Sequence, residues 1–140
     1  MYRFALVCFF SVVLTGCQVG QLTTLYNDDT SIEENGLRVD ANHKPITGIY
    51  QKHSKKMRLL EESQYVNGKL NGLSKIYSDK GKLILTSQYH KGKLNGKQVS
   101  YYNNGKEYEV STYIKDQLEG GQITYDPQGN ILRKGSYQNG

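Results

Sequence analysis

The chain contains the stretch Tyr65-Val66-Asn67-Gly68-Lys69-Leu70-Asn71-Gly72, which decides its fold because the same pattern returns along most of the 140 residues. Tyrosines recur every twelve residues, at Tyr65, Tyr77, Tyr89, Tyr101, Tyr113, Tyr125 and Tyr137. A glycine series marks the full period of 24 residues, at Gly48, Gly72, Gly96 and Gly120. Regular spacing of this kind is the signature of a protein built from one repeated structural unit.

Two further glycine series lie between the tyrosines. Gly81, Gly105 and Gly129 each follow a tyrosine by four residues, and Gly68, Gly92 and Gly140 follow one by three, with Asp116 in the missing place. Glycine adopts the positive φ of tight turns without steric cost. The segments between them, such as Leu73 to Tyr77, favour strands. The pattern predicts consecutive β-hairpins with structural turn glycines at Gly68, Gly72, Gly81, Gly92, Gly96, Gly105, Gly120 and Gly129.

The tyrosines are expected in two rows, because each precedes a turn and neighbouring strands run antiparallel. Tyr65, Tyr89, Tyr113 and Tyr137 should line one long side of the sheet, and Tyr77, Tyr101 and Tyr125 the other. Intervening strands would offer Leu94 or Leu118 on the first side and Leu83 or Ile131 on the second, at about 0.2–1 kcal/mol for each aromatic–aliphatic contact. Lys75 shares a repeat position with Val99 and Ile123, which a sheet covered by helices would not accommodate. We therefore expect an all-β, elongated, single-layer antiparallel sheet of consecutive hairpins.

The N-terminus is typical of an export signal. Arg3 precedes an apolar run of eleven residues, Phe4 to Leu14, which is too short to span a hydrocarbon core of about 30 Å. The following Leu14-Thr15-Gly16-Cys17 resembles the bacterial lipobox, which implies cleavage before Cys17, lipidation of its sulfur, and attachment to the cell envelope. By the sorting pattern of such lipoproteins, Gln18 implies the outer membrane if the host has one. The alternative is an ordinary secretory signal with a chance cysteine.

Three segments follow from these signals: a lipoprotein signal peptide at 1–16, a polar tether at 17–44 and a repeat domain at 45–140. The tether has no clean period and a net charge of −3 between Gln18 and Lys44. We expect it to be mostly flexible, with a short initial strand at Leu37-Arg38-Val39 as the alternative. The repeat domain is basic, with 15 Lys+Arg against 8 Asp+Glu.

The pattern Tyr-x-x-Gly-x-x-Asn-Gly-x-x-x-x-Tyr, read from Tyr65 or Tyr89, resembles the bacterial variant of the MORN (membrane occupation and recognition nexus) repeat. The resemblance covers about four units from Gly48 to Gly140. The first unit departs from it, with His53 and Met57 where tyrosine and glycine are expected. The resemblance extends to a family named YwqK-type antitoxins, which implies neutralisation of a toxin as one alternative function.

Catalytic chemistry has little support in the sequence. The histidines His43, His53 and His90 lack metal-ligand spacing. Ser63, Ser87 and Ser111 recur at one repeat position, as structural residues do, whereas a nucleophile would be singular and accompanied by a base. We therefore expect neither an enzyme nor a cofactor or metal.

The lysines that crowd the turns have two interpretations. They can serve solubility and discourage edge-to-edge pairing of sheets, or they can form a face for anionic lipid headgroups, wall polymer or an acidic partner. Nucleic acid is not expected for an exported chain. The lysines in question are Lys69, Lys80, Lys82, Lys91, Lys93 and Lys106.

The sequence favours a lipid-anchored, non-enzymatic scaffold that binds a protein or an envelope polymer, with Cys17 as its anchor. The tyrosine rows, together with Tyr102 and Tyr108, are the expected contact surface. Antitoxin or immunity function and headgroup binding by the repeats are the alternatives. Gly140 falls within a unit, so we also consider a homodimer formed through the C-terminal edge strand.

Overall fold

The computed structural model describes residues 24–138, so the predicted signal peptide and Cys17 lie outside the described residues. The described chain is made of strands and turns. Its strands are β1 (Leu25–Tyr26), β2 (Ser31–Glu34), β3 (Leu37–Asp40), β4 (Gly48–His53), β5 (Leu59–Val66), β6 (Lys69–Tyr77), β7 (Leu83–His90), β8 (Lys93–Tyr101), β9 (Glu107–Ile114), β10 (Gln117–Tyr125) and β11 (Ile131–Tyr137).

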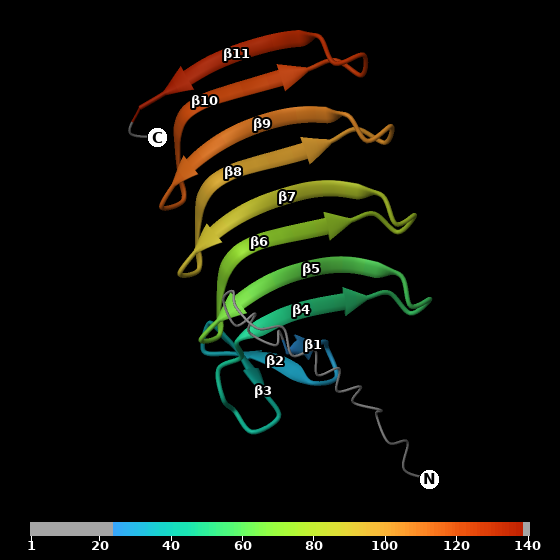
Figure 1. Cartoon of the computed structure of the whole chain (residues 1–140), viewed down its shortest axis with the longest axis vertical. Coiled ribbons are helices and arrows are strands. Elements are labelled where there is room, and N and C mark those ends of the chain that lie inside the picture. The colour runs from blue at the N-terminus through green and yellow to red at the C-terminus, as the bar shows by residue number, and fades with distance from the viewer. Residues whose placement is uncertain (1–23, 139–140) are drawn as a thin grey trace, which may run out of the picture.

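Nine of these strands form one open sheet in the order β1-β4-β5-β6-β7-β8-β9-β10-β11. Strand β1 runs parallel to β4, and all later neighbours are antiparallel. Figure 1 shows the hairpins stacked one above another from β4 to β11, with their turns in two rows along opposite sides. The predicted all-β architecture of consecutive hairpins is confirmed.

The predicted aromatic–aliphatic pairs lie directly across from each other on adjacent strands. On the first side, Tyr65 pairs with Leu70, and the equivalent pairs recur one and two units later. On the second side, Tyr77 pairs with Leu83 at a bulge, and the last hairpin repeats this with Tyr125 and Ile131. Contacts of this kind fasten each strand to the next.

Small polar side chains fill the middle of the sheet. The recurring serines are almost fully buried: Ser63 is 0% exposed, Ser87 3% and Ser111 2%. The Oγ atoms of Ser63 and Ser74 lie 2.8 Å apart, and Gln98 Nε2 donates a 3.0 Å hydrogen bond to Ser87 Oγ. Since buried hydroxyls are costly unless they are hydrogen-bonded, these pairs hold the strands in register.

The two tyrosine rows lie on opposite faces. Side chains two residues apart on a strand share a face, so Tyr65 lies on the face of Ser63, which we call the serine face. Tyr137 Oη donates a 3.1 Å hydrogen bond to Gln122 Oε1 on that same face. Tyr77 lies three residues after Ser74 and therefore points to the opposite face.

Glycine is required where the strands bulge beside the serines. The pairing of β5 with β6 shifts between Ser63 and Tyr65, and Gly72, opposite this shift, has a φ of 110°. A Cβ on Gly72 would lie 1.9 Å from Gln64 Oε1, an atom that accepts a 3.1 Å hydrogen bond from the Leu73 amide. The same arrangement recurs at Gly96. In the 24-residue glycine series, Gly72, Gly96 and Gly120 therefore mark these pairing shifts.

The turns on one side, which we call the short turns, are residues 67–68, 91–92 and 115–116. They stack through main-chain hydrogen bonds. The Gly68 amide donates to the Ile46 carbonyl over 2.8 Å, and the Gly92 amide donates to the Leu70 carbonyl over 2.7 Å. Asp116 continues the series with a 2.9 Å bond to the Leu94 carbonyl. Each short turn thus rests on the preceding unit through neutral backbone groups.

The turns on the other side, the long turns, are residues 54–58, 78–82, 102–106 and 126–130. They contact one another through cationic side chains. Arg58 Nη1 donates to the Asp79 carbonyl over 2.6 Å, and Lys82 Nζ donates to the Asn103 carbonyl over 2.5 Å. Lys106 Nζ repeats the contact with Gln128 over 2.6 Å. Each long turn is therefore linked to the next by a cationic side chain that donates a hydrogen bond to a main-chain carbonyl.

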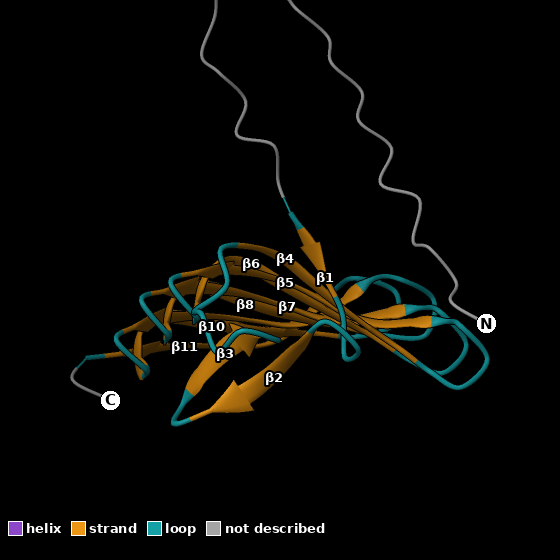
Figure 2. Cartoon of the chain, turned by 90° about the horizontal axis from the view of Figure 1, so that it is seen from below, coloured by secondary structure: helices purple, strands orange, loops and turns teal. Residues whose placement is uncertain are grey.

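Residues 24–44 differ from the expected flexible tether, because they fold into β1–β3 and pack on the first hairpin (Figure 2). We call them the N-terminal cap. The Arg38 amide donates to the Gly68 carbonyl over 2.9 Å, and the Ile46 amide donates back to the Arg38 carbonyl over 3.0 Å. Val39 and Ile46 are buried at the junction. The alternative strand at Leu37-Arg38-Val39 is confirmed by β3.

Candidate functional site

Except for Tyr108, the expected contact tyrosines are half-buried rather than fully exposed. Burial raises the pKa of Tyr65 and of Tyr89, so both hydroxyls stay neutral at ordinary pH. Tyr102 donates its hydroxyl to the Tyr125 carbonyl over 2.8 Å and therefore links the third long turn to the end of β10. Tyr108 packs edge-on against Tyr102 with ring centroids 5.1 Å apart and is 44% exposed. Of these two residues, Tyr108 offers the larger contact surface.

Arg38 connects the N-terminal cap to the aromatic side chains of the first hairpin. Its guanidinium carbon lies 3.9 Å from the ring centroid of Tyr50 and 5.8 Å from that of Tyr65. Tyr50 is 1% exposed, meets Tyr65 edge-on and donates its hydroxyl to Asp28 in the cap. Burial, followed by the Asp28 hydrogen bond, raises the pKa of Tyr50. A cation stacked in this way is held in a fixed orientation.

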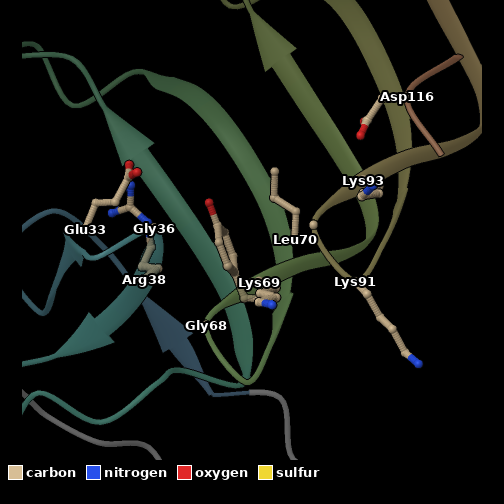
Figure 3. Close-up of a pocket in the computed structure, with 11 residues that line it drawn as sticks. Glu33, Gly36, Arg38, Gly68, Lys69, Leu70, Lys91, Lys93 and Asp116 are labelled. Carbon is tan, nitrogen blue, oxygen red and sulfur yellow. The ribbon is translucent and has the colours of Figure 1, made fainter.

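A groove of 440 Å³ opens beside Arg38, where the N-terminal cap meets the three short turns. Figure 3 shows Leu70 between Arg38 on one side and Lys93 with Asp116 on the other, while Lys91 reaches outward at the rim. We call this site the basic groove. Its charged lining residues are Arg38, Lys69, Lys91, Lys93, Glu33 and Asp116. Four cations against two carboxylates give the lining a net charge of +2.

The lysines of the two turn rows are in different situations. Lys82 and Lys106 already donate to carbonyl oxygens of the next long turn. The ammonium groups of Lys69, Lys91 and Lys93 make no hydrogen bond or ion pair with the described residues 24–138. Lys80, in the second long turn, likewise makes no hydrogen bond or ion pair with these residues, so the lysines available to a ligand include Lys80 as well as the three of the basic groove.

The histidines and carboxylates form no metal centre in the part of the chain that the structure describes, where no group of three potential ligands occurs. His43 Nδ1 instead lies 2.8 Å from Glu34 Oε2, and this hydrogen bond raises the pKa of the His43 imidazole. Within residues 24–138, no helix is long and apolar enough to cross a membrane.

Sequence reasoning missed Arg38 as a site residue and did not separate the lysines by role. Two signals were present. Arg58, Lys82 and Lys106 recur at 24-residue spacing, which indicates a structural task. The Asn35-Gly36 pair between Ile32 and Leu37 predicts a hairpin turn, but the neighbouring Glu33 and Glu34 obscure the apolar alternation of the strand before it.

No family model matches the chain, and no curated protein matches it. Among solved structures it is similar to a chain in the crystal structure of the GtfA/B complex bound to UDP and GlcNAc, at 18% sequence identity and a TM-score of 0.40. The similarity covers 86% of this chain and 28% of that chain, so this chain spans less than a third of the other's length. A likeness at this level transfers neither activity nor ligand.

Proposed function

We propose that the chain is a non-enzymatic binding scaffold, anchored to the cell envelope through lipidated Cys17, whose MORN-like hairpin sheet holds a protein partner. The observation that carries this proposal is the single-layer sheet itself. Beyond the two-stranded sheet β2-β3 on the first hairpin, no sheet or helix lies against its nine strands in residues 24–138, and half-buried tyrosines line both faces.

The repeated residues have either structural or surface roles, and this supports binding rather than catalysis. The serines and bulge glycines maintain the sheet, and the cations of the long turns link its hairpins. The tyrosine rings and the short-turn lysines are what the repeats present to the surroundings. Tyrosine suits protein contacts because its rigid ring offers apolar area at little entropic cost while its hydroxyl finds a polar partner.

Site-specific photo-crosslinking in cells tests the function. A photoreactive residue at Tyr108 should capture a defined protein in the envelope fraction. Tyr89→Ala with Tyr113→Ala removes rings from the serine face, and Tyr101→Ala with Tyr125→Ala is the matched pair for the opposite face. We expect one pair to abolish the crosslink and the other to retain it, with circular dichroism confirming that both variants stay folded. Equal crosslinking in the wild type and both pairs would reject the scaffold.

The anchor is tested separately by metabolic labelling with a radioactive fatty acid. The wild-type chain should incorporate the label and sediment with membranes, and Cys17→Ser should do neither. Cys8→Ser is the control, because it leaves the lipobox intact. A labelled Cys17→Ser variant would contradict attachment at that sulfur.

A further inference from the structure

Three main-chain amides occupy equivalent places beside the short turns, 24 residues apart, at Ile46, Leu70 and Leu94. Two of them donate to an oxygen of a neighbouring element. The Ile46 amide donates to the Arg38 carbonyl over 3.0 Å. The Leu94 amide donates to the Asp116 carboxylate over 2.7 Å. The middle amide, that of Leu70, belongs to a residue that lines the basic groove.

The Leu70 amide points toward the second short turn. The Leu70 carbonyl accepts a hydrogen bond from the Gly92 amide, and the N–H and C=O of an extended residue point to the same side. Leu94 illustrates this, because both of its main-chain groups bond to Asp116. Gly92 is the equivalent of Asp116 one unit earlier and has no side chain to offer the Leu70 amide.

We propose that the basic groove binds a carboxylate of an acidic peptide segment, whose oxygen accepts a hydrogen bond from the Leu70 amide as Asp116 does from Leu94. The Arg38 guanidinium, oriented by Tyr50 and Tyr65, lines the same groove as Leu70, and so does Lys69. Charge-assisted hydrogen bonds of this kind are about twice as strong as neutral ones. The proposal names the chemistry of a partner and so rests on the proposed scaffold function.

The lining favours a carboxylate over a more highly charged ligand. Glu33 and Asp116 lie among the four cations and reduce the net charge of the groove to +2. They would repel a polyphosphate more strongly than a single carboxylate. The volume of 440 Å³ falls in the range of about 300–1,000 Å³ that ligand sites occupy, which suits a short peptide segment.

The chain itself supplies the decisive variant. Gly92→Asp should place an internal carboxylate against the Leu70 amide, because the equivalent Asp116 adopts a φ of 73° and Gly92 a φ of 84°. A Cβ on Gly92 meets only ordinary contacts, the nearest at 3.7 Å from Lys69 Cβ. Gly92→Ala is the matched control, since it loses the same glycine without adding a carboxylate.

The test is a titration of the purified full chain with acetyl-Asp-Gly-Asp-amide, followed through the amide signal of Leu70 by nuclear magnetic resonance. We expect saturable binding, about tenfold or more tighter than for the matching asparagine peptide. Gly92→Asp should weaken binding about tenfold or more, whereas Gly92→Ala should retain it. Arg38→Gln should weaken it, with the amide spectrum used to confirm that the variant is folded.

Three results would overturn the proposal. One is equal binding of the aspartate and asparagine peptides, and another is unchanged binding by Gly92→Asp. The third is a preference for inorganic phosphate or for phosphatidylglycerol vesicles over the peptide, which would assign the groove to a phosphate ligand. If the peptide does not bind but the Tyr108 crosslink persists, the groove proposal fails while the scaffold function stands.

Discussion

The short turns and the long turns connect neighbouring hairpins through different chemical groups. Both rows must fasten one hairpin to the next along an open sheet that has little apolar core. The short turns use backbone amides and carbonyls, such as Gly92 N–H to the Leu70 carbonyl. The long turns use cations, such as Lys82 Nζ to the Asn103 carbonyl. Lysines of similar exposure therefore have different roles, and their count alone does not locate a binding surface.

The difference in packing should produce the largest stability effect. Gly68 in a short turn and Gly81 in a long turn have φ values of 75° and 76°, so alanine suffers the same backbone strain at both. A Cβ on Gly68 would also lie 2.9 Å from the Arg38 carbonyl oxygen, whereas nothing lies within 4 Å at Gly81. We expect Gly81→Ala to cost about 1 kcal/mol and Gly68→Ala about 2–4 kcal/mol. Urea unfolding measures both free energies. Equal losses of stability would mean that the Arg38 carbonyl of the cap does not contact Gly68 closely.

The cation contacts should produce the next largest effect. Lys106→Met removes the donor to the Gln128 carbonyl and should cost about 0.5–1 kcal/mol. Lys93→Met removes a charge from the basic groove and should change the free energy of unfolding by less than about 0.5 kcal/mol. If chemical unfolding shows that Lys93→Met lowers the free energy of unfolding more than Lys106→Met does, Lys93 also has a structural role and the proposed difference between the two residues is wrong.

Met57 allows a gain in stability to be predicted. It occupies the glycine position of the first long turn with a φ of 59° and is 78% exposed. Met57→Gly removes the steric cost of this conformation and should raise the free energy of unfolding by about 0.5 kcal/mol. Lys56→Gly in the same turn serves as the control, because its φ is not positive and its side chain makes no hydrogen bond with residues 24–138, so it should bring no gain. A lower melting temperature for Met57→Gly would show that the turn conformation is wrong.

The last long turn should give the smallest effect, a dependence on pH. Hydrogen bonds from Asn130, followed by those from other turn amides, hold the pKa of Asp126 below its usual value of 3.8. The folded chain therefore binds fewer protons than the unfolded chain around that pH. This stabilisation is present above pH 3.8 and is lost as pH falls through the lowered folded value. Asp126→Asn should flatten that part of the stability profile, and an unaltered profile would contradict the cause.

The repeat made most of the sheet predictable from the sequence. Tyr65 and Leu70, for example, recur in phase, and one hairpin therefore predicts the others. The N-terminal cap was harder to predict, because Glu33 and Glu34 hide the alternation of β2 and because its packing depends on Arg38 reaching Tyr50, a contact between distant residues. The basic groove could not be predicted from any single unit, since it combines the cap with three successive short turns.

The most direct test of the account is a comparison of individual lysine ammonium signals, by nuclear magnetic resonance, while the aspartate peptide is added to the full chain. The signals of Lys69, Lys91 and Lys93 should shift together and saturate, while those of Lys82 and Lys106 stay in place because the next long turn already holds them. Equal shifts at all five lysines, or shifts confined to Lys82 and Lys106, would contradict the assignment of Lys82 and Lys106 to structural contacts and of Lys69, Lys91 and Lys93 to binding.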